Sequence, residues 1–183
     1  MELYGGSAAP SRLRGVTRVD LRRLRLRPGE VRREQLEVVL EPFLLGGQRY
    51  EPTLSKVPVD LEISQALGAT VFDLRLEAHV TGPCMRCLGF AELECTVSAR
   101  EFHDPDAAPA DALRSEYVAD GHLDVGAWAR DAIALELPEQ ILCRDDCAGL
   151  CPSCGKDLNV EPHEHNEREP DPRWAALNEL RDL

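Results

Sequence analysis

The sequence predicts an α+β fold, an antiparallel β-sheet (open or barrel-like) packed by one or two helices. Apolar and polar residues alternate along four stretches with the two-residue period of strands that bury one face. A pattern typical of a helix follows, and the last part of the chain is dense in cysteine and histidine but poor in apolar residues. These three observations predict a sheet, a helix that covers it, and a C-terminal tail whose composition differs from that of the sheet and helix.

The alternation predicts the strands and their turns. The four predicted strands cover residues 36–40, 57–63, 72–80 and 91–97. Glycines, which favour turns, separate these runs at Gly46, Gly47 and Gly68. Strict alternation indicates one buried and one solvated face, which is typical of antiparallel sheets.

Helical spacing replaces the alternation near residue 124. Apolar and charged side chains over 124–137 predict a helix that ends at Pro138 and covers the apolar face of the sheet. The preceding segment 103–122 is acidic and rich in alanine and proline, which predicts a solvated loop. A short closing helix is expected over 172–183, with Trp174 as a packing anchor.

The chain is therefore expected to form one co-folded unit of three parts. Residues 1–33 are an arginine-rich segment, partly strand; residues 34–138 hold the sheet and helix; residues 139–183 form the C-terminal tail with its closing helix. That tail has too little apolar surface to fold by burial alone, so a bound ion is its expected organiser.

Composition limits the class of protein. The chain has 183 residues, 43% of them hydrophobic. It shows no apolar run of about 18 residues and no apolar leader near its start. We expect a cytoplasmic protein without a membrane partner.

Cysteine spacing predicts metal sites. Six of the seven cysteines form close pairs, Cys84 with Cys87, Cys143 with Cys147 and Cys151 with Cys154, and His163 and His165 follow. Tetrahedral zinc takes four thiolate or imidazole ligands, drawn as two pairs that are each separated by two to four residues. Eight ligands are the number that two closed, structural zinc sites require.

Spacing allows several pairings of these pairs. We assign Cys84, Cys87, Cys143 and Cys147 to one site, which ties the tail to the sheet. The knuckle Cys151-Pro-Ser-Cys154-Gly is assigned to the other site together with His163 and His165.

Two alternatives remain open at this point. The cysteine pairs could be redox pairs, although no βαβ pattern surrounds them. The two histidines could belong to a solvated polar tail, in which case Cys143, Cys147, Cys151 and Cys154 would form a single compact site. Cys95 stands apart, because its strand position places it among apolar neighbours as a buried free thiol.

Catalysis is not indicated. A site closed by four protein ligands leaves no position for a reactive water. The sequence shows no phosphate-binding glycine loop and no nucleophile motif, so neither an enzyme nor a small-molecule substrate is expected.

Several motifs, in their order along the chain, resemble one bacterial family. They are Cys-Met-Arg-Cys-Leu at 84–88, Leu-Pro at 137–138, Cys-Arg-Asp-Asp-Cys-Ala-Gly-Leu-Cys-Pro-Ser-Cys-Gly-Lys-Asp-Leu-Asn at 143–159 and Asp-Pro-Arg-Trp-Ala-Ala-Leu at 171–177. Together they are similar to the YceD family of large ribosomal RNA subunit accumulation proteins, over roughly residues 10–183. Many members have Cys-x-Cys where this chain has His163-Glu-His165.

The resemblance implies a non-catalytic role in ribosome biogenesis, supporting the synthesis, processing or accumulation of large-subunit ribosomal RNA. It also supports the ligand assignment, because shorter members keep the first cysteine pair and potential ligands near 143–147 but lack the later knuckle. The implied partners are an rRNA precursor or ribosomal and assembly proteins.

Charge marks a candidate RNA contact. The net charge is −12, yet residues 1–33 carry nine arginines and three carboxylates (net +6), which leaves −18 on the remainder. Guanidinium groups suit phosphate, and the candidate RNA-binding residues are Arg22, Arg23, Arg25, Arg27, Arg32 and Arg33. As a strand, residues 23–27 would set three arginines on one face.

Two other functions compete with RNA binding. The arginines could be a solvated face that balances an acidic body, and the protein would then be a zinc-stabilised adaptor that holds a protein partner without RNA contact. A thiol redox or zinc sensor is the third possibility.

Overall fold

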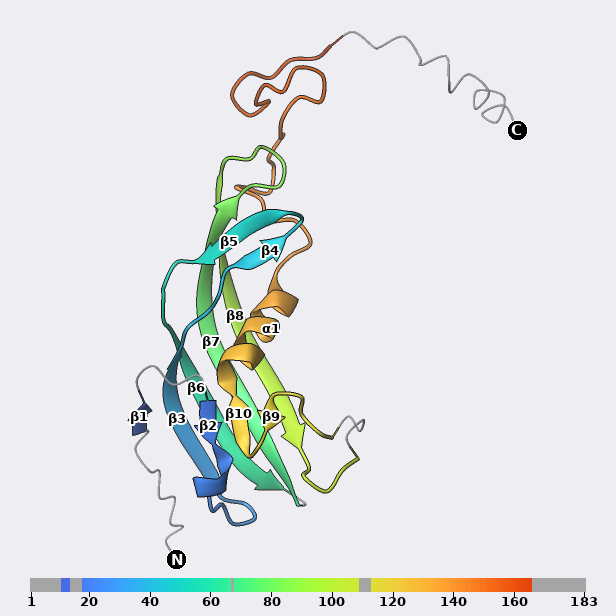
Figure 1. The fold of residues 1–183 in the computed structure, drawn as a ribbon. Coiled ribbons are helices and arrows are strands. Elements are labelled where there is room, and N and C mark those ends of the chain that lie inside the picture. Colours follow the sequence, from blue (N-terminus) through green and yellow to red (C-terminus); the bar gives the residue numbers. More distant parts are fainter. Residues whose placement is uncertain (1–10, 14–17, 67, 109–112, 166–183) are drawn as a thin grey trace, which may run out of the picture.

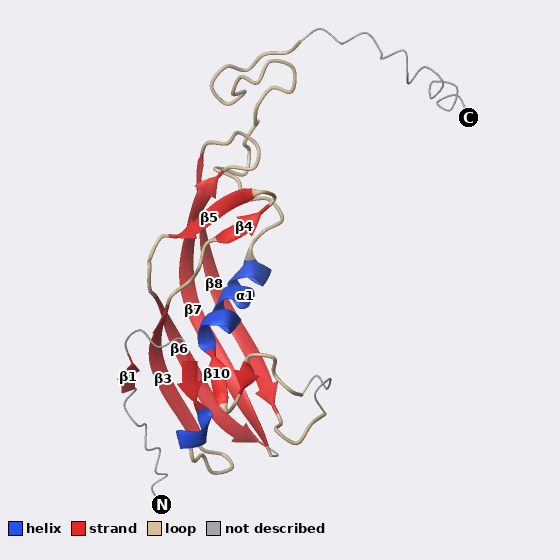
Figure 2. Cartoon of the chain, in the orientation of Figure 1, coloured by secondary structure: helices blue, strands red, loops and turns tan. Residues whose placement is uncertain are grey.

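In the part of the chain that the structure describes, the fold is an open, mostly antiparallel sheet with one α-helix across its inner face (Figures 1 and 2). The computed structural model describes residues 11–13, 18–66, 68–108 and 113–165, with side chains from Arg18 onward. In chain order the elements are β1 (Ser11–Leu13), β2 (Arg18–Asp20), the 3-10 helix η1 (Leu21–Arg23), β3 (Val31–Val38), β4 (Phe43–Leu45), β5 (Gln48–Pro52), β6 (Val57–Ala66), β7 (Ala69–Pro83), β8 (Phe90–His103), β9 (Val118–Ala119), β10 (His122–Asp124) and α1 (Val125–Glu136). The α+β class with an antiparallel sheet is confirmed, and the sheet is open, not closed into a barrel.

Strand β7 is the centre of the seven-stranded sheet. It pairs with β8 along one edge and with β6 and β5 along the other, all antiparallel. Strand β3 adds to β6, and β1 joins β3 in parallel. All four predicted strands are present. Strands β6, β7 and β8 extend beyond their alternating runs, whereas β3 begins earlier than predicted, at Val31, and ends at Val38, two residues before the predicted end.

Helix α1 covers the inner face, as predicted. The Trp128 ring meets the edge of Phe72 at a centroid distance of 6.5 Å and stacks on Tyr117 at 6.3 Å. The Asp124 carboxylate accepts from the Ala127 N–H at 3.0 Å, which caps the first turn. Leu137 is extended (φ −67°, ψ 135°), as the residue before a proline prefers to be, so the helix ends where Pro138 predicts.

The predicted loop over 103–122 is partly wrong. Within it, β9 pairs with β10, and β10 pairs with β2 to make a separate three-stranded sheet. Leu123 and Val19 are buried there, which stabilises strands of only two or three residues. Such short strands show no alternation that a sequence pattern could reveal.

Residues 23–27 do not form the strand that would set three arginines on one face. Arg23 ends η1, and residues 24–27 have no ladder partner. The alternation still has a physical meaning, because Leu24 and Leu26 pack against the core while Arg25 and Arg27 are exposed.

The expected closing helix over 172–183, with Trp174, lies outside the described residues. None of the helices within the described ranges has the length and apolarity that a membrane crossing requires.

Candidate metal centres

The first group of ligand-type side chains forms where the turn after β7 meets the chain after α1. Cys84 and Cys87 lie on the turn between β7 and β8, which the Cys84 N–H closes by donating to the Gly89 carbonyl at 2.6 Å. The Met85 N–H donates to the Ile141 carbonyl at 2.8 Å, and Ile141 is itself buried. This link brings the chain beyond α1 back to the turn.

The sulfur spacing in this group fits a tetrahedral metal. The Sγ atoms of Cys84 and Cys147 are 3.8 Å apart, and those of Cys87 and Cys143 are 3.6 Å apart. Sulfurs on one tetrahedral zinc, each about 2.3 Å from the ion, lie about 3.8 Å from one another. A disulfide would bring them to about 2.05 Å. All four ligand atoms lie within 4.8 Å of one another, so the group could hold a metal ion.

The pKa values of the thiols in this group diverge. Burial opposes ionisation of Cys84, but backbone N–H groups, led by that of Cys87, lower its pKa to about 6. Desolvation and the neighbouring sulfurs raise the pKa of Cys143 to about 12. The sulfurs compete for negative charge, and a divalent cation is what would let all four be thiolates together.

Tyr50 and Gly82 position the first group. The Tyr50 hydroxyl, on the buried side of hairpin β4–β5, donates to the Pro83 carbonyl at 2.9 Å, directly before Cys84. A Cβ on Gly82 would overlap the Tyr50 ring, so only glycine lets the ring lie there. Neither residue was a candidate from the sequence, because no spacing signal joins positions 32 apart.

The second group lies in the described part of the tail. Cys151 and Cys154 share a knuckle, in which the Gly155 N–H donates to the Cys151 carbonyl at 2.8 Å. His163 Nε2 is 3.1 Å from the Cys154 sulfur, and the His165 ring packs against the His163 ring at a centroid distance of 5.0 Å. The four ligand atoms lie within 4.8 Å of one another, so this group too could hold a metal ion.

The orientation of His163 suits a metal ligand. Its Nδ1 is 2.7 Å from the Glu161 carbonyl oxygen. A carbonyl can only accept, so Nδ1 carries a hydrogen, and Nε2 is the ring nitrogen that faces Cys154 and would bind a metal. Backbone N–H groups, led by that of Cys154, lower the pKa of Cys151 to about 6.

The structure thus gathers the eight ligand-type residues into the same two groups that the sequence predicts. It also brings the groups together: the Leu150 N–H donates to the Arg86 carbonyl at 3.1 Å, and the Asn159 amide lies 3.5 Å from the Cys147 sulfur. Arg86 and Asn159 were not candidates from the sequence, although both belong to the quoted motifs. Cys95 is buried on β8, away from both groups, and burial raises its pKa, as expected for a lone core thiol.

The six candidate arginines do not share one face. Arg22 and Arg23 are paired with Asp20 at 3.3 and 3.2 Å. Arg32 and Arg33, adjacent on β3, are paired with Glu34 and Glu62. Among the described residues, Arg25 and Arg27 are exposed and have no ion pair.

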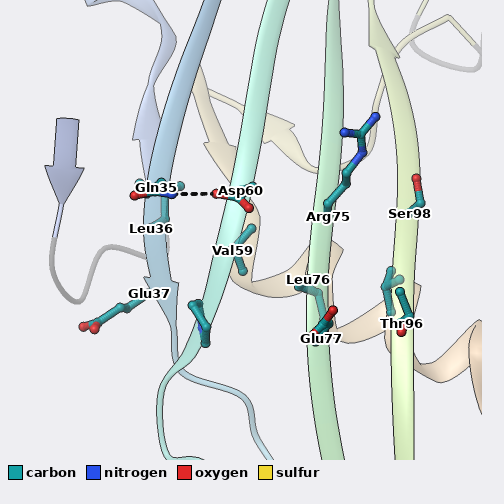
Figure 3. A pocket seen from close by; sticks show the side chains of 12 residues that line it. Gln35, Leu36, Glu37, Val59, Asp60, Arg75, Leu76, Glu77, Thr96 and Ser98 are labelled. Carbon is teal, nitrogen blue, oxygen red and sulfur yellow. Dashed lines mark hydrogen bonds between the residues drawn. The ribbon is translucent and has the colours of Figure 1, made fainter. Parts of the chain in front are cut away.

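A broad depression of about 900 Å³ lies on the outer face of the sheet, across β3, β6, β7 and β8 (Figure 3). The Gln35 amide donates to Asp60 at 3.1 Å, while Arg75 points away from that carboxylate (Figure 3). Glu37 and Glu77 line the same depression. No cysteine lines it, so it is separate from both groups of ligand-type residues.

Comparison with known proteins identifies the chain's relatives. The family model described as large ribosomal RNA subunit accumulation protein YceD matches residues 72–181, which include all eight ligand-type residues. An uncharacterized protein of Mycobacterium tuberculosis is 33% identical over 167 residues, covering 88% of this chain and 80% of its own. The uncharacterized protein YlbN of Bacillus subtilis is 30% identical over 137 residues, covering 73% and 76%. No solved structure matches the chain. The chain therefore belongs to the YceD family of large ribosomal RNA subunit accumulation proteins.

Proposed function

We propose that this protein is a non-catalytic, cytoplasmic factor of large-subunit ribosome biogenesis, stabilised by two structural zinc ions. The observation that carries the proposal is the family match, because it covers both ligand groups and the family is named for rRNA accumulation. Cys84, Cys87, Cys143 and Cys147 hold one ion, and Cys151, Cys154, His163 and His165 hold the other.

A structural role follows from the ligand sets. Each group supplies four cysteine or histidine side chains, which fill the tetrahedral shell that zinc prefers and leave no position for water. When bound, the ions crosslink the tail to the turn between β7 and β8. Residues 143–165 include few buried apolar side chains, so this crosslink replaces a core. The reducing cytoplasm keeps the thiols available.

We propose that RNA contact, where it occurs, is made by the arginines that follow η1. Arg25 and Arg27 are exposed and need not break an ion pair to reach phosphate, whereas Arg22, Arg23, Arg32 and Arg33 must exchange a carboxylate partner. The acidic remainder of the chain repels a polyanion, so binding is local and salt-dependent.

Charge reversal tests this contact. Arg25→Glu and Arg27→Glu, singly and together, are compared with Arg75→Glu, which reverses an exposed arginine on the outer face of the sheet. Binding of a large-subunit rRNA fragment is measured over a range of salt. The account expects each reversal at 25 or 27 to weaken binding and to reduce the salt slope by about 1, with little effect at 75. Equal weakening at all three positions would show that the segment is not the contact.

A protein partner is the second candidate, and the outer face of the sheet favours it. That face carries Glu37, Asp60 and Glu77 around the depression, where acidic groups would suit a basic ribosomal or assembly protein. Crosslinking in cells, followed by identification of the attached molecules, separates the two: an adaptor yields a ribosomal or assembly protein and no rRNA.

A further inference from the structure

Asn159 belongs to the loop of the second group but contacts the first. It lies between Cys154 and His163 in the sequence, yet its Nδ2 is 3.5 Å from the Cys147 sulfur. Cys147 is only 2% exposed, so water does little to solvate its charge. The Asn159 amide places an N–H donor against this sulfur.

The hydrogen bonds of the Asn159 side chain fix which end of the amide faces the sulfur. Its Oδ1 accepts from the Ala148 N–H and from the Arg144 guanidinium, each at 2.8 Å. Both donors belong to the segment that carries Cys143 and Cys147. Since the oxygen is turned to these donors, the NH2 group points to Cys147 and to the Asp157 carboxylate, which accepts at 2.6 Å.

The backbone holds the two loops together at the same place. The Leu158 N–H donates to the Gly149 carbonyl at 2.9 Å, and Leu150 and Asp157 form an isolated bridge. Gly149 has φ +76°, and a Cβ there would lie 3.2 Å from the Arg86 carbonyl oxygen. The segment 149–150, which leads into the second knuckle, thus packs against Arg86 on the turn that carries Cys84 and Cys87.

We propose that Asn159 is a positioning residue of the first metal centre and that, through it, order at the second centre raises the metal affinity of the first. The inference rests on the proposed metal binding. Four thiolates around a divalent cation leave a net charge of −2, and an N–H donor on a buried sulfur offsets part of it. Asn159 can supply that donor only while its own loop is folded, and the second centre folds the loop.

The replacement Asn159→Asp tests the donor. Aspartate keeps the shape and the oxygen that accepts from Ala148, but it sets a carboxylate oxygen against the Cys147 thiolate. Val160→Asp is the matched control, because it adds the same charge one residue away on a side chain that is 82% exposed. Asn159→Ala removes the donor without adding charge.

Zinc affinity is measured on the full chain by competition with a chromophoric chelator. Alkylation of Cys143 and Cys154, localised by mass spectrometry, reports the two centres separately. The first centre of Asn159→Asp should bind zinc about tenfold or more weaker than wild type, and that of Val160→Asp should be unchanged. Asn159→Ala should fall between them.

The coupling is tested by a double-mutant cycle with Cys151→Ser/Cys154→Ser, which disables the second centre. This variant should weaken zinc binding at the first centre, and adding Asn159→Asp should weaken it little further, because the two changes remove the same contact. Additive effects would overturn the coupling. Equal first-centre affinities for Asn159→Asp and Val160→Asp would overturn the role of Asn159. Failure of the wild type to bind zinc would instead contradict the proposed function.

Discussion

The Tyr50 hydroxyl donates to the Pro83 carbonyl at 2.9 Å, one residue before Cys84, so hairpin β4–β5, which joins the sheet through β7, holds the start of the first group of ligand-type residues. Tyr50 is fully buried. Replacing it with phenylalanine leaves that carbonyl without this donor, and we expect the free energy of unfolding to fall by about 1–3 kcal/mol. Urea denaturation of the zinc-loaded protein measures the change. An unchanged midpoint would show that the bond does not support the turn.

Substitution of Gly82 should destabilise the protein at least as much as the replacement of Tyr50 by phenylalanine. A Cβ at this position meets the Tyr50 ring, so Gly82→Ala forces the ring and the hairpin to move. We expect a loss of about 1–3 kcal/mol or more from overpacking. Combining it with Tyr50→Ala should recover part of the loss, because the ring that alanine meets is gone. Additive losses in denaturation would argue against this contact.

Sequence patterns predicted the long strands, helix α1 and the two groups of ligand-type residues, for related reasons. Each rests on a local signal: a two-residue period, a helical period with Pro138, or paired ligands two to four residues apart. The grouping of Cys84 with Cys147 spans 63 residues. Ligand spacing alone left several groupings of the cysteine pairs open, and the family resemblance supported this one.

The features that could not be predicted depend on contacts between residues far apart in the sequence, which leave no local sequence pattern. The sheet of β2, β9 and β10 unites segments about 100 residues apart through only a few buried side chains. Tyr50 contacts Gly82, and Asn159 contacts Cys147. The turns that carry these residues come together only in the folded chain. The alternation over residues 23–27 is compatible with a strand, but alternation also arises where a segment packs its leucines against the core without a ladder partner.

His103 should make stability depend on pH. Burial, and then the Arg114 charge, lower the pKa of His103, while Asp104 partly opposes them; its Nδ1 is buried without a hydrogen-bond partner among the described residues. The folded state therefore prefers the neutral ring. Its contribution is present above the ordinary pKa of about 6.5 and is lost as the pH falls below it.

The His103→Leu variant removes this pH-dependent contribution to stability. As the pH falls from 8 to 5, the free energy of unfolding of the wild type should decrease relative to that of His103→Leu. Parallel curves for the two proteins over that range would contradict the lowered pKa.

Variants of the cysteines should fall into two classes, those that lose a bound metal ion and those that keep both. Cys143→Ser should remove one ion, because it breaks the first group, and Cys154→Ser should remove one from the second. Cys95→Ala should keep both ions and cost only the packing of a small buried side chain, about 1 kcal/mol. Elemental analysis of each purified variant checks this. Loss of metal in Cys95→Ala would mean that the grouping is wrong.

The metal content of the full chain, purified under reducing conditions, tests the central claim most directly. We predict two zinc ions per chain by elemental analysis, and removing them with a strong chelator should expose the backbone amides of residues 143–165 to hydrogen exchange while the sheet stays protected. Protein that is metal-free as isolated, with those amides protected, would contradict the account.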